Sequence, residues 1–172
     1  MNEHGKIIYS HIDPSDTVLD LGCGILQEFG YSPPVDKYLG VDVFDPYLRK
    51  IADQGVMTIR GKLPDVCDSF LDNSWNIVLL ADVIEHLTKE DGLELLDHAE
   101  RIAKKCVIID TPNGFEPQEG WDAWGLPYCQ FQAHLSGWTD QEFTERGYSC
   151  SLIKNRTPKG KPVTSVIAVR YA

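Results

Sequence analysis

The 172-residue sequence lacks the features that mark several large classes of protein. Its five cysteines form no C-x-x-C pair and are odd in number, so we expect reduced thiols and neither a disulfide framework nor a structural zinc site. No stretch approaches the roughly 20 apolar residues that a membrane-spanning helix needs. The opening residues, MNEHGKIIYS, contain no apolar core of signal-peptide length. We therefore expect a cytoplasmic protein with no membrane contact.

Positive charge is also scarce. The 26 acidic residues outnumber the 16 lysines and arginines, which gives a formal net charge of −10. No cluster of basic residues is long enough to follow a phosphate backbone, so we expect no nucleic-acid partner. The sequence leaves the oligomeric state open.

What the chain does contain is a series of short apolar runs rich in Val, Ile and Leu. They lie at residues 17–21, 38–43, 56–59, 76–80 and 106–110. Continuous runs of this kind are typical of strands buried on both faces of a parallel sheet. Two later runs, at 149–155 and 165–172, flank a Pro/Gly/Lys turn and predict a terminal antiparallel hairpin. The pattern favours an α/β fold, and the length fits a single domain over residues 1–172, with an N-terminal segment at 1–16.

Helices are predicted between these runs, over residues 45–55, 88–105 and from 139 to a stop at Gly147. In the longest of them, Thr88 and Asp91 are placed to form a capping box. Leu93, Leu96, Ala99 and Ala103 repeat on one face, which we expect to cover the sheet. The segment 112–137 is long and irregular, and we interpret it as a lid or acceptor-binding loop. Its aromatic residues are Phe115, Trp121, Trp124, Tyr128 and Phe131.

The first apolar run leads into a turn, TVLDLGCGILQ, that carries Gly22 and Gly24. In an open parallel sheet, ligands bind beyond the carboxyl ends of the strands, and glycine lets a ligand lie against the main chain. Asp42 ends the second run about 20 residues later, where a carboxylate can accept both hydrogen bonds of a ribose diol. The alternative is that the glycines serve turn geometry and Asp42 caps a helix.

Position 27 is Gln27, so the dinucleotide fingerprint G-x-G-x-x-G is not met. The chain instead resembles the class I S-adenosylmethionine-dependent methyltransferases, most closely their small-molecule and ubiquinone-type branch. The resemblance rests on five segments in the family's order: VLDLGCG, YLGVDV, WNIVLLADVIEHL, CVIIDTPNG and HLSGWTDQEFTERGY. It implies a Rossmann-like, doubly wound sheet of seven strands, mostly parallel, that ends in the antiparallel hairpin.

The resemblance also implies S-adenosylmethionine as the cofactor and a set of residues around it. Leu26 departs from the family pattern, which has a third glycine there, and Lys62 stands where an acidic residue often contacts adenine. Asp20, Gly22 and Gly24 would surround the methionine half. The complete set of candidate cofactor-binding residues is Asp20, Gly22, Cys23, Gly24, Asp42, Val43, Leu63, Ala81 and Asp82.

The stretch DVIEH offers a separate group of polar side chains. Asp82, Glu85 and His86 would project from one side of a helical turn, and His134 follows in HLSGWT. Some methyltransferase families hold a divalent metal with a similar group, and oxygen-rich ligands would favour magnesium or manganese. Alternatively, Glu85 and His86 brace the loop. Metal dependence is left open, and we name His134 and His86 as candidate catalytic residues, since a histidine near neutrality can act as general base.

The function that we expect is methyl transfer to an oxygen, nitrogen or carbon nucleophile of a small molecule by in-line displacement. The protein would align donor and acceptor and exclude water, so no protein nucleophile is needed. The alternatives are a cofactor-binding module without catalysis, a metal-assisted O-methyltransferase, and a nicotinamide or flavin oxidoreductase.

Overall fold

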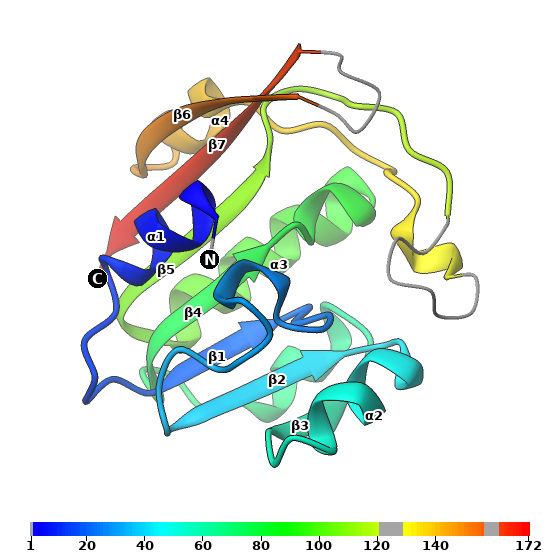
Figure 1. The fold of residues 1–172 in the computed structure, drawn as a ribbon. Coiled ribbons are helices and arrows are strands. Elements are labelled where there is room, and N and C mark those ends of the chain that lie inside the picture. The colour runs from blue at the N-terminus through cyan, green and yellow to red at the C-terminus, as the bar shows by residue number, and fades with distance from the viewer. Residues whose placement is uncertain (1, 121–128, 157–161) are drawn as a thin grey trace.

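The computed structural model describes residues 2–120, 129–156 and 162–172. Seven strands form one sheet in the order β3-β2-β1-β4-β5-β7-β6 (Figure 1). Strands β1 to β5 pair in parallel, and β7 lies antiparallel between β5 and β6. The strands are β1 (Val18–Leu21), β2 (Tyr38–Asp42), β3 (Met57–Arg60), β4 (Trp75–Ala81), β5 (Ala103–Pro112), β6 (Ser149–Arg156) and β7 (Pro162–Tyr171). The predicted fold is confirmed.

The continuous apolar runs form strands because both faces of the sheet are covered. In β1, Leu19 and Leu21 belong to the buried cluster on one face of the sheet, and Val18 belongs to the cluster on the other face. The same alternation divides β4, where Val78 and Leu79 are buried on opposite faces. Successive strand residues point to opposite sides, so an unbroken apolar run is what a doubly covered strand requires.

Within the part of the chain that the structure describes, four α-helices supply the two covering layers (Figure 1): α1 (Glu3–Tyr9), α2 (Asp45–Ala52), α3 (Lys89–Ile102) and α4 (Asp140–Glu145). Ile8 of α1 and Ile51 of α2 pack in one cluster. Leu96 of α3 and Phe143 of α4 pack in the other. The helices predicted from residues 45, 88 and 139 are therefore present. Among the described helices, none combines the length and the apolar composition needed to cross a membrane.

The buried face of α3 differs from the predicted one. Thr88 caps the helix as expected, since its side chain accepts a hydrogen bond from Asp91 N at 3.1 Å. Leu93, however, is 44% exposed, and the buried residues are Gly92, Leu95, Leu96, Ala99 and Ile102. Gly92 is buried against Trp138, and a Cβ at this position would lie 2.5 Å from Cζ2 of that tryptophan. The space that a side chain would fill is occupied by this tryptophan.

The N-terminal segment contains α1, which the sequence analysis did not predict. Asn2 caps it by accepting a hydrogen bond from Gly5 N at 2.7 Å. His4 Nδ1 lies 2.6 Å from Oδ2 of the fully buried Asp110 at the end of β5. The side chains of His4 and of His98 on α3 are each only 16% exposed.

Only part of the expected lid at 112–137 is described. Trp121, Trp124 and Tyr128 lie outside the described residues. After them come Cys129 and the 3₁₀ turn η4 (Gln130–Gln132), and the chain returns to the core at Trp138, which is 2% exposed. Trp138 forms isolated bridges with Asn113 and Gly114.

Candidate active site

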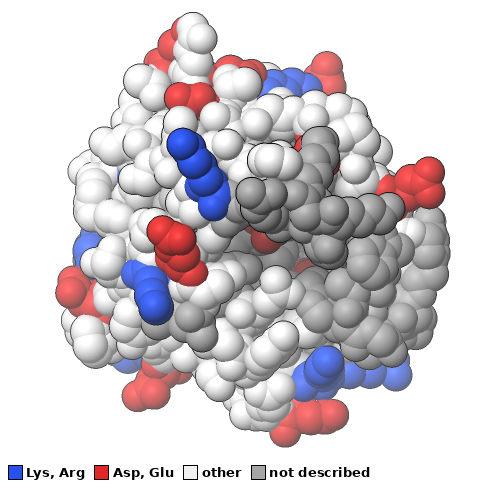
Figure 2. All heavy atoms as spheres, turned by 45° about the horizontal axis from the view of Figure 1, so that its top comes forward, with Lys and Arg blue, Asp and Glu red and all other residues white. Residues whose placement is uncertain are grey.

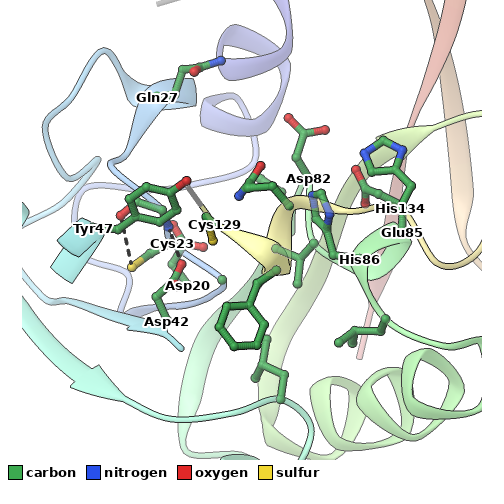
Figure 3. A pocket seen from close by; sticks show the side chains of 18 of the residues that line it. Asp20, Cys23, Gln27, Asp42, Tyr47, Asp82, Glu85, His86, Cys129 and His134 are labelled. Atoms are coloured by element: carbon green, nitrogen blue, oxygen red, sulfur yellow. Dashed lines mark hydrogen bonds between the residues drawn. The ribbon is translucent and has the colours of Figure 1, made fainter. Parts of the chain in front are cut away.

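A pocket of about 860 Å³ opens at the carboxyl ends of β1, β2 and β4, and Figure 3 shows it from close by. Strand order reverses between β1 and β4, because β2 and β3 extend from one side of β1 and β5 from the far side of β4. Such a switch point is where open α/β sheets bind ligands. The volume suits a cofactor together with a small second molecule, since ligand pockets commonly measure about 300–1,000 Å³.

Two glycines shape the turn after β1, for different reasons. Gly22 has φ +89°, and a Cβ there would lie 2.3 Å from Cγ2 of Val83, so this glycine is required by protein packing. Gly24 has φ +49°, and a Cβ there would meet no atom of the described residues within 4 Å. Gly24 lines the pocket. Its missing side chain therefore leaves space for a ligand.

Leu26, at the position of the family's third glycine, adopts the backbone conformation that a glycine would favour. Its φ is +63°, in the left-handed region that costs an ordinary residue about 1–2 kcal/mol. The side chain is 2% exposed and packs in the cluster beneath α1 and α2. Burial of a leucine stabilises by about 1.5–3 kcal/mol, which offsets the backbone cost. The substitution thus leaves the turn intact.

Two acidic residues flank this turn. Asp20 Oδ2 accepts a hydrogen bond from the Tyr38 hydroxyl at 2.5 Å. Asp42 Oδ2 accepts one from Gly24 N at 3.0 Å, and its Oδ1 accepts one from Phe44 N at 2.8 Å. Burial raises the pKa of Asp42, although these backbone hydrogen bonds oppose the shift. Each carboxylate oxygen has two lone pairs, and Asp42 lines the pocket, so its carboxylate can accept a further hydrogen bond there.

The remaining candidate cofactor-binding residues also line the pocket. Val43 follows Asp42, and Leu63 is 8% exposed beside the exposed Lys62. Cys23 is 6% exposed, and burial first, with the nearby Asp20 and Asp42 charges, raises the pKa of its thiol. Cys23 therefore stays a neutral thiol. The structure brings the predicted set together at one place, in this order along the chain: Asp20, Gly22, Cys23, Gly24, Asp42, Val43, Leu63, Ala81 and Asp82.

The chain after β4 bends sharply. Asp82 has φ +51°, a strained conformation of the kind that gathers at functional sites, and its N–H donates to Asp110 O at 2.8 Å. The helical turn predicted for DVIEH is a 3₁₀ turn, η3 (Ile84–His86), that begins after this bend. Asp82 is therefore not part of the turn that carries Glu85 and His86, and the group of potential metal ligands found among the described residues omits it.

Glu85, His86 and His134 do come together, on the side of the pocket away from Asp20 and Asp42 (Figure 3). The two imidazole rings are 4.8 Å apart between centroids and nearly perpendicular. Burial, followed by the charge of His134, lowers the pKa of His86 to about 4. Burial also lowers the pKa of His134 and raises that of Glu85 to about 7. Both rings are neutral at physiological pH.

Several pocket residues were not identified from the sequence. Asn2, Glu3 and His4 of the N-terminal segment line it, as do Tyr47 and Cys129. Asn2 before an acidic residue is a recognisable helix start, which would have placed α1. No local signal marks Tyr47 or Cys129, because both reach the pocket through tertiary packing.

The family model described as methionine biosynthesis protein MetW matches residues 2–120, more than half of the chain. The chain belongs to the MetW family. The matched range runs from α1 through the glycine turn, Asp42 and the η3 turn. No curated protein sequence matches this MetW-family chain with significance.

Solved structures share the fold at low sequence identity. A SAM-dependent methyltransferase from Archaeoglobus fulgidus is 15% identical, with a TM-score of 0.62 over 96% of this chain and 94% of that one. One from Methanosarcina mazei is 16% identical, with a TM-score of 0.62 over 96% of each chain.

A third neighbour is the 1,6-didemethyltoxoflavin-N1-methyltransferase of Burkholderia thailandensis, solved with 1,6-didemethyltoxoflavin and S-adenosylhomocysteine bound. It is 13% identical, with a TM-score of 0.68 over 98% of this chain and 76% of that one. These likenesses confirm the class I methyltransferase fold that the sequence motifs predicted.

Proposed function

We propose that this MetW-family protein transfers a methyl group from S-adenosylmethionine to an oxygen, nitrogen or carbon nucleophile of a small molecule. The observation that carries the proposal is the open face of Gly24 beside Asp42, within the pocket at the switch point of the sheet. A side-chain-free bend next to a buried carboxylate suits a nucleoside, because the ribose hydroxyls can donate to the carboxylate while the backbone allows close approach. S-adenosylmethionine supplies an electrophilic methyl group on its sulfonium.

The residues on the β1 and β2 side would hold this cofactor. Asp42 is assigned to the ribose hydroxyls, and the turn from Gly22 to Gly24 to the methionine half. Leu63 and Val43 offer apolar contact for adenine. Lys62 is exposed and has no acidic side chain to offer the adenine amine, so adenine recognition would rely on apolar contact and backbone groups.

The acceptor would lie on the opposite side of the pocket, near η3 and His134. Phe131 and Leu135 line the pocket and are 42% and 59% exposed, which suits contact with an apolar part of a small molecule. Neutral His86 and His134 rings can accept the proton that an attacking hydroxyl or amine loses. The Burkholderia neighbour, which was solved with 1,6-didemethyltoxoflavin bound, supports a small-molecule acceptor.

We expect no nucleic-acid partner for this protein. On the face shown in Figure 2, the described lysine and arginine side chains lie scattered among acidic and uncharged ones and form no continuous basic patch. With a net charge of −10, long-range electrostatics would repel a phosphate backbone.

The direct test is calorimetry with S-adenosylmethionine and S-adenosylhomocysteine. Asp42→Ala is expected to weaken binding by about 1–3 kcal/mol, because it removes hydrogen bonds to buried hydroxyls. Asp42→Asn keeps one acceptor oxygen, so its affinity should lie between those of wild type and Asp42→Ala. Asp45→Ala, a change of similar chemistry on α2 outside the pocket, is the matched control and should bind as wild type does. Equal dissociation constants for wild type and Asp42→Ala would refute the ribose assignment.

A further inference from the structure

One group of side chains in the pocket has the composition of a metal site. Glu85 and His86 stand on η3, and His134 lies in the segment that follows η4. One potential ligand atom from each residue lies within 4.8 Å of the other two. The members come from segments almost 50 residues apart in sequence, so the fold itself brings them together.

The hydrogen bonds of the two histidines leave a metal-binding nitrogen on each ring. His86 Nδ1 lies 3.2 Å from Ala133 O, and His134 Nδ1 lies 2.5 Å from Glu116 O. A carbonyl oxygen only accepts, so Nδ1 must carry the proton in both rings. In a neutral ring with a protonated Nδ1, Nε2 keeps its lone pair. Metal-ligating histidines are typically oriented in this way, with the other ring nitrogen donating to a backbone carbonyl.

The third member is held in place just as firmly. Glu85 is 3% exposed, and its Oε2 accepts a hydrogen bond from Thr111 Oγ1 at 2.9 Å. Its backbone carbonyl accepts hydrogen bonds from Leu135 N at 2.8 Å and Ser136 N at 3.1 Å. These bonds tie η3 to the segment that carries His134, so the three donors are positioned by a second layer of contacts.

We propose that Glu85, His86 and His134 bind one divalent transition-metal ion of the zinc type, inside the pocket. Two imidazole nitrogens and one carboxylate oxygen are a set that zinc uses in open sites, whereas magnesium requires mainly oxygen ligands. The magnesium or manganese preference inferred from the sequence depended on Asp82, which lies outside the group. Ligand atoms around tetrahedral zinc lie about 3.4 Å apart, given bond lengths of about 2.1 Å, so small side-chain rotations would close the site.

Three protein ligands leave at least one coordination position open toward the pocket. A hydroxyl or water bound there would release its proton to solvent water more readily, because the cation would lower the pKa of the bound oxygen. An ion in place would occupy the Nε2 lone pairs, so His86 and His134 would then act as ligands. The proton-accepting role proposed for them above would apply only to the ion-free protein. The binding site itself does not depend on the proposed methyl transfer, and its test involves ion binding alone.

The experiment uses the full chain without a histidine tag, stripped with a chelator and then titrated with zinc by calorimetry and with cobalt by visible spectroscopy. We expect one ion per chain and cobalt bands of nitrogen and oxygen coordination. Glu85→Gln, His86→Gln and His134→Gln should each weaken binding at least tenfold. His98→Gln, a matched change of a histidine on α3, should bind as wild type does.

Three outcomes would overturn the proposal. They are no stoichiometric zinc binding, equal binding by wild type and all three variants, and a thiolate-to-cobalt charge-transfer band, which would assign the ion to cysteines. Circular dichroism and thermal unfolding of each variant show whether lost binding reflects lost folding. S-adenosylhomocysteine affinity of the stripped protein is measured in parallel, so failure of the ion site and failure of the cofactor proposal give different results.

Discussion

At the residue scale, the two glycines of the first turn act differently although the sequence presents them alike. Gly22 is fixed by contact with Val83 within the protein, whereas Gly24 faces the pocket. The pair therefore separates a folding requirement from a binding requirement at positions two residues apart. The distinction can be tested with one substitution type.

Gly22→Ala should destabilise the protein by about 3 kcal/mol, since strain from a positive φ and overpacking against Val83 add together. Gly24→Ala should lower the free energy of unfolding by only about 1 kcal/mol, because the sole cost is the backbone strain of a positive φ. It should nevertheless weaken S-adenosylhomocysteine binding at least tenfold. Thermal unfolding and calorimetry provide the two measurements.

Gly55→Ala is the matched control for Gly24→Ala. Gly55 also has a positive φ, +83°, and open space around it within the described residues, but it lies outside the pocket. It should show the same small loss of stability with unchanged affinity. Equal affinities for Gly24→Ala and Gly55→Ala would contradict the role assigned to Gly24.

At the element scale, α3, α4 and the terminal hairpin are joined by Glu100. Its Oε1 accepts hydrogen bonds from Arg146 Nε at 2.6 Å and the Tyr148 hydroxyl at 3.0 Å, and its Oε2 pairs with Arg170. Partial burial alone would raise the pKa of Glu100, but the hydrogen bonds from Arg146, Arg170 and Tyr148 outweigh it and lower the pKa below its ordinary value. The ionised carboxylate thus stabilises the contact between these elements.

Glu100→Gln should lower the free energy of unfolding at pH 7 by on the order of 1–2 kcal/mol, allowing for partial exposure. Because the folded-state pKa lies below the unfolded one, this contribution is present above the unfolded pKa, about 4.3, and is lost as pH falls through the folded value. The gap in melting temperature between wild type and Glu100→Gln should therefore narrow in acid. A difference in melting temperature between wild type and Glu100→Gln that stays constant from pH 7 to pH 3 would show that Glu100 contributes no charge-dependent stability.

The strands could be predicted from the sequence, whereas the buried face of α3 and the packing of α1 could not. Strands were predictable because a doubly covered strand leaves an unbroken apolar run, as in NIVLL. The buried face of α3 was not, because Gly92 has no apolar side chain to mark it and is buried only because Trp138 fills its place. Helix α1 has a recognisable start at Asn2, but it is short, and it is held in place by the contact of His4 with Asp110 and the burial of Ile8. Such tertiary causes leave little trace in local sequence.

Within the site, the prediction succeeded where chain neighbours define the geometry and failed where a bend intervenes. The glycine turn and Asp42 occupy the ends of adjacent parallel strands, so their meeting follows from the sheet. Asp82 was expected beside Glu85 and His86, but its positive φ redirects the chain before η3 begins. A non-glycine residue in the left-handed region cannot be recognised from periodicity.

At the scale of the whole molecule, the pocket divides into two regions on either side of the switch between β1 and β4. The β1–β2 side offers glycine backbone and Asp42, and the β4–β5 side offers Glu85, His86 and His134 (Figure 3). Both regions open into one volume of about 860 Å³, which is what a transfer reaction between two bound molecules requires. The arrangement connects the fold to the proposed reaction.

The most direct measurement is a crystal structure of the protein with S-adenosylhomocysteine. We expect the ribose hydroxyls on Asp42, the homocysteine chain along Gly22 to Gly24, and the sulfur directed toward the region of His86 and His134. A nucleoside bound elsewhere, or a turn that closes over the pocket and leaves Asp42 without contact to the ribose, would contradict the proposed cofactor site.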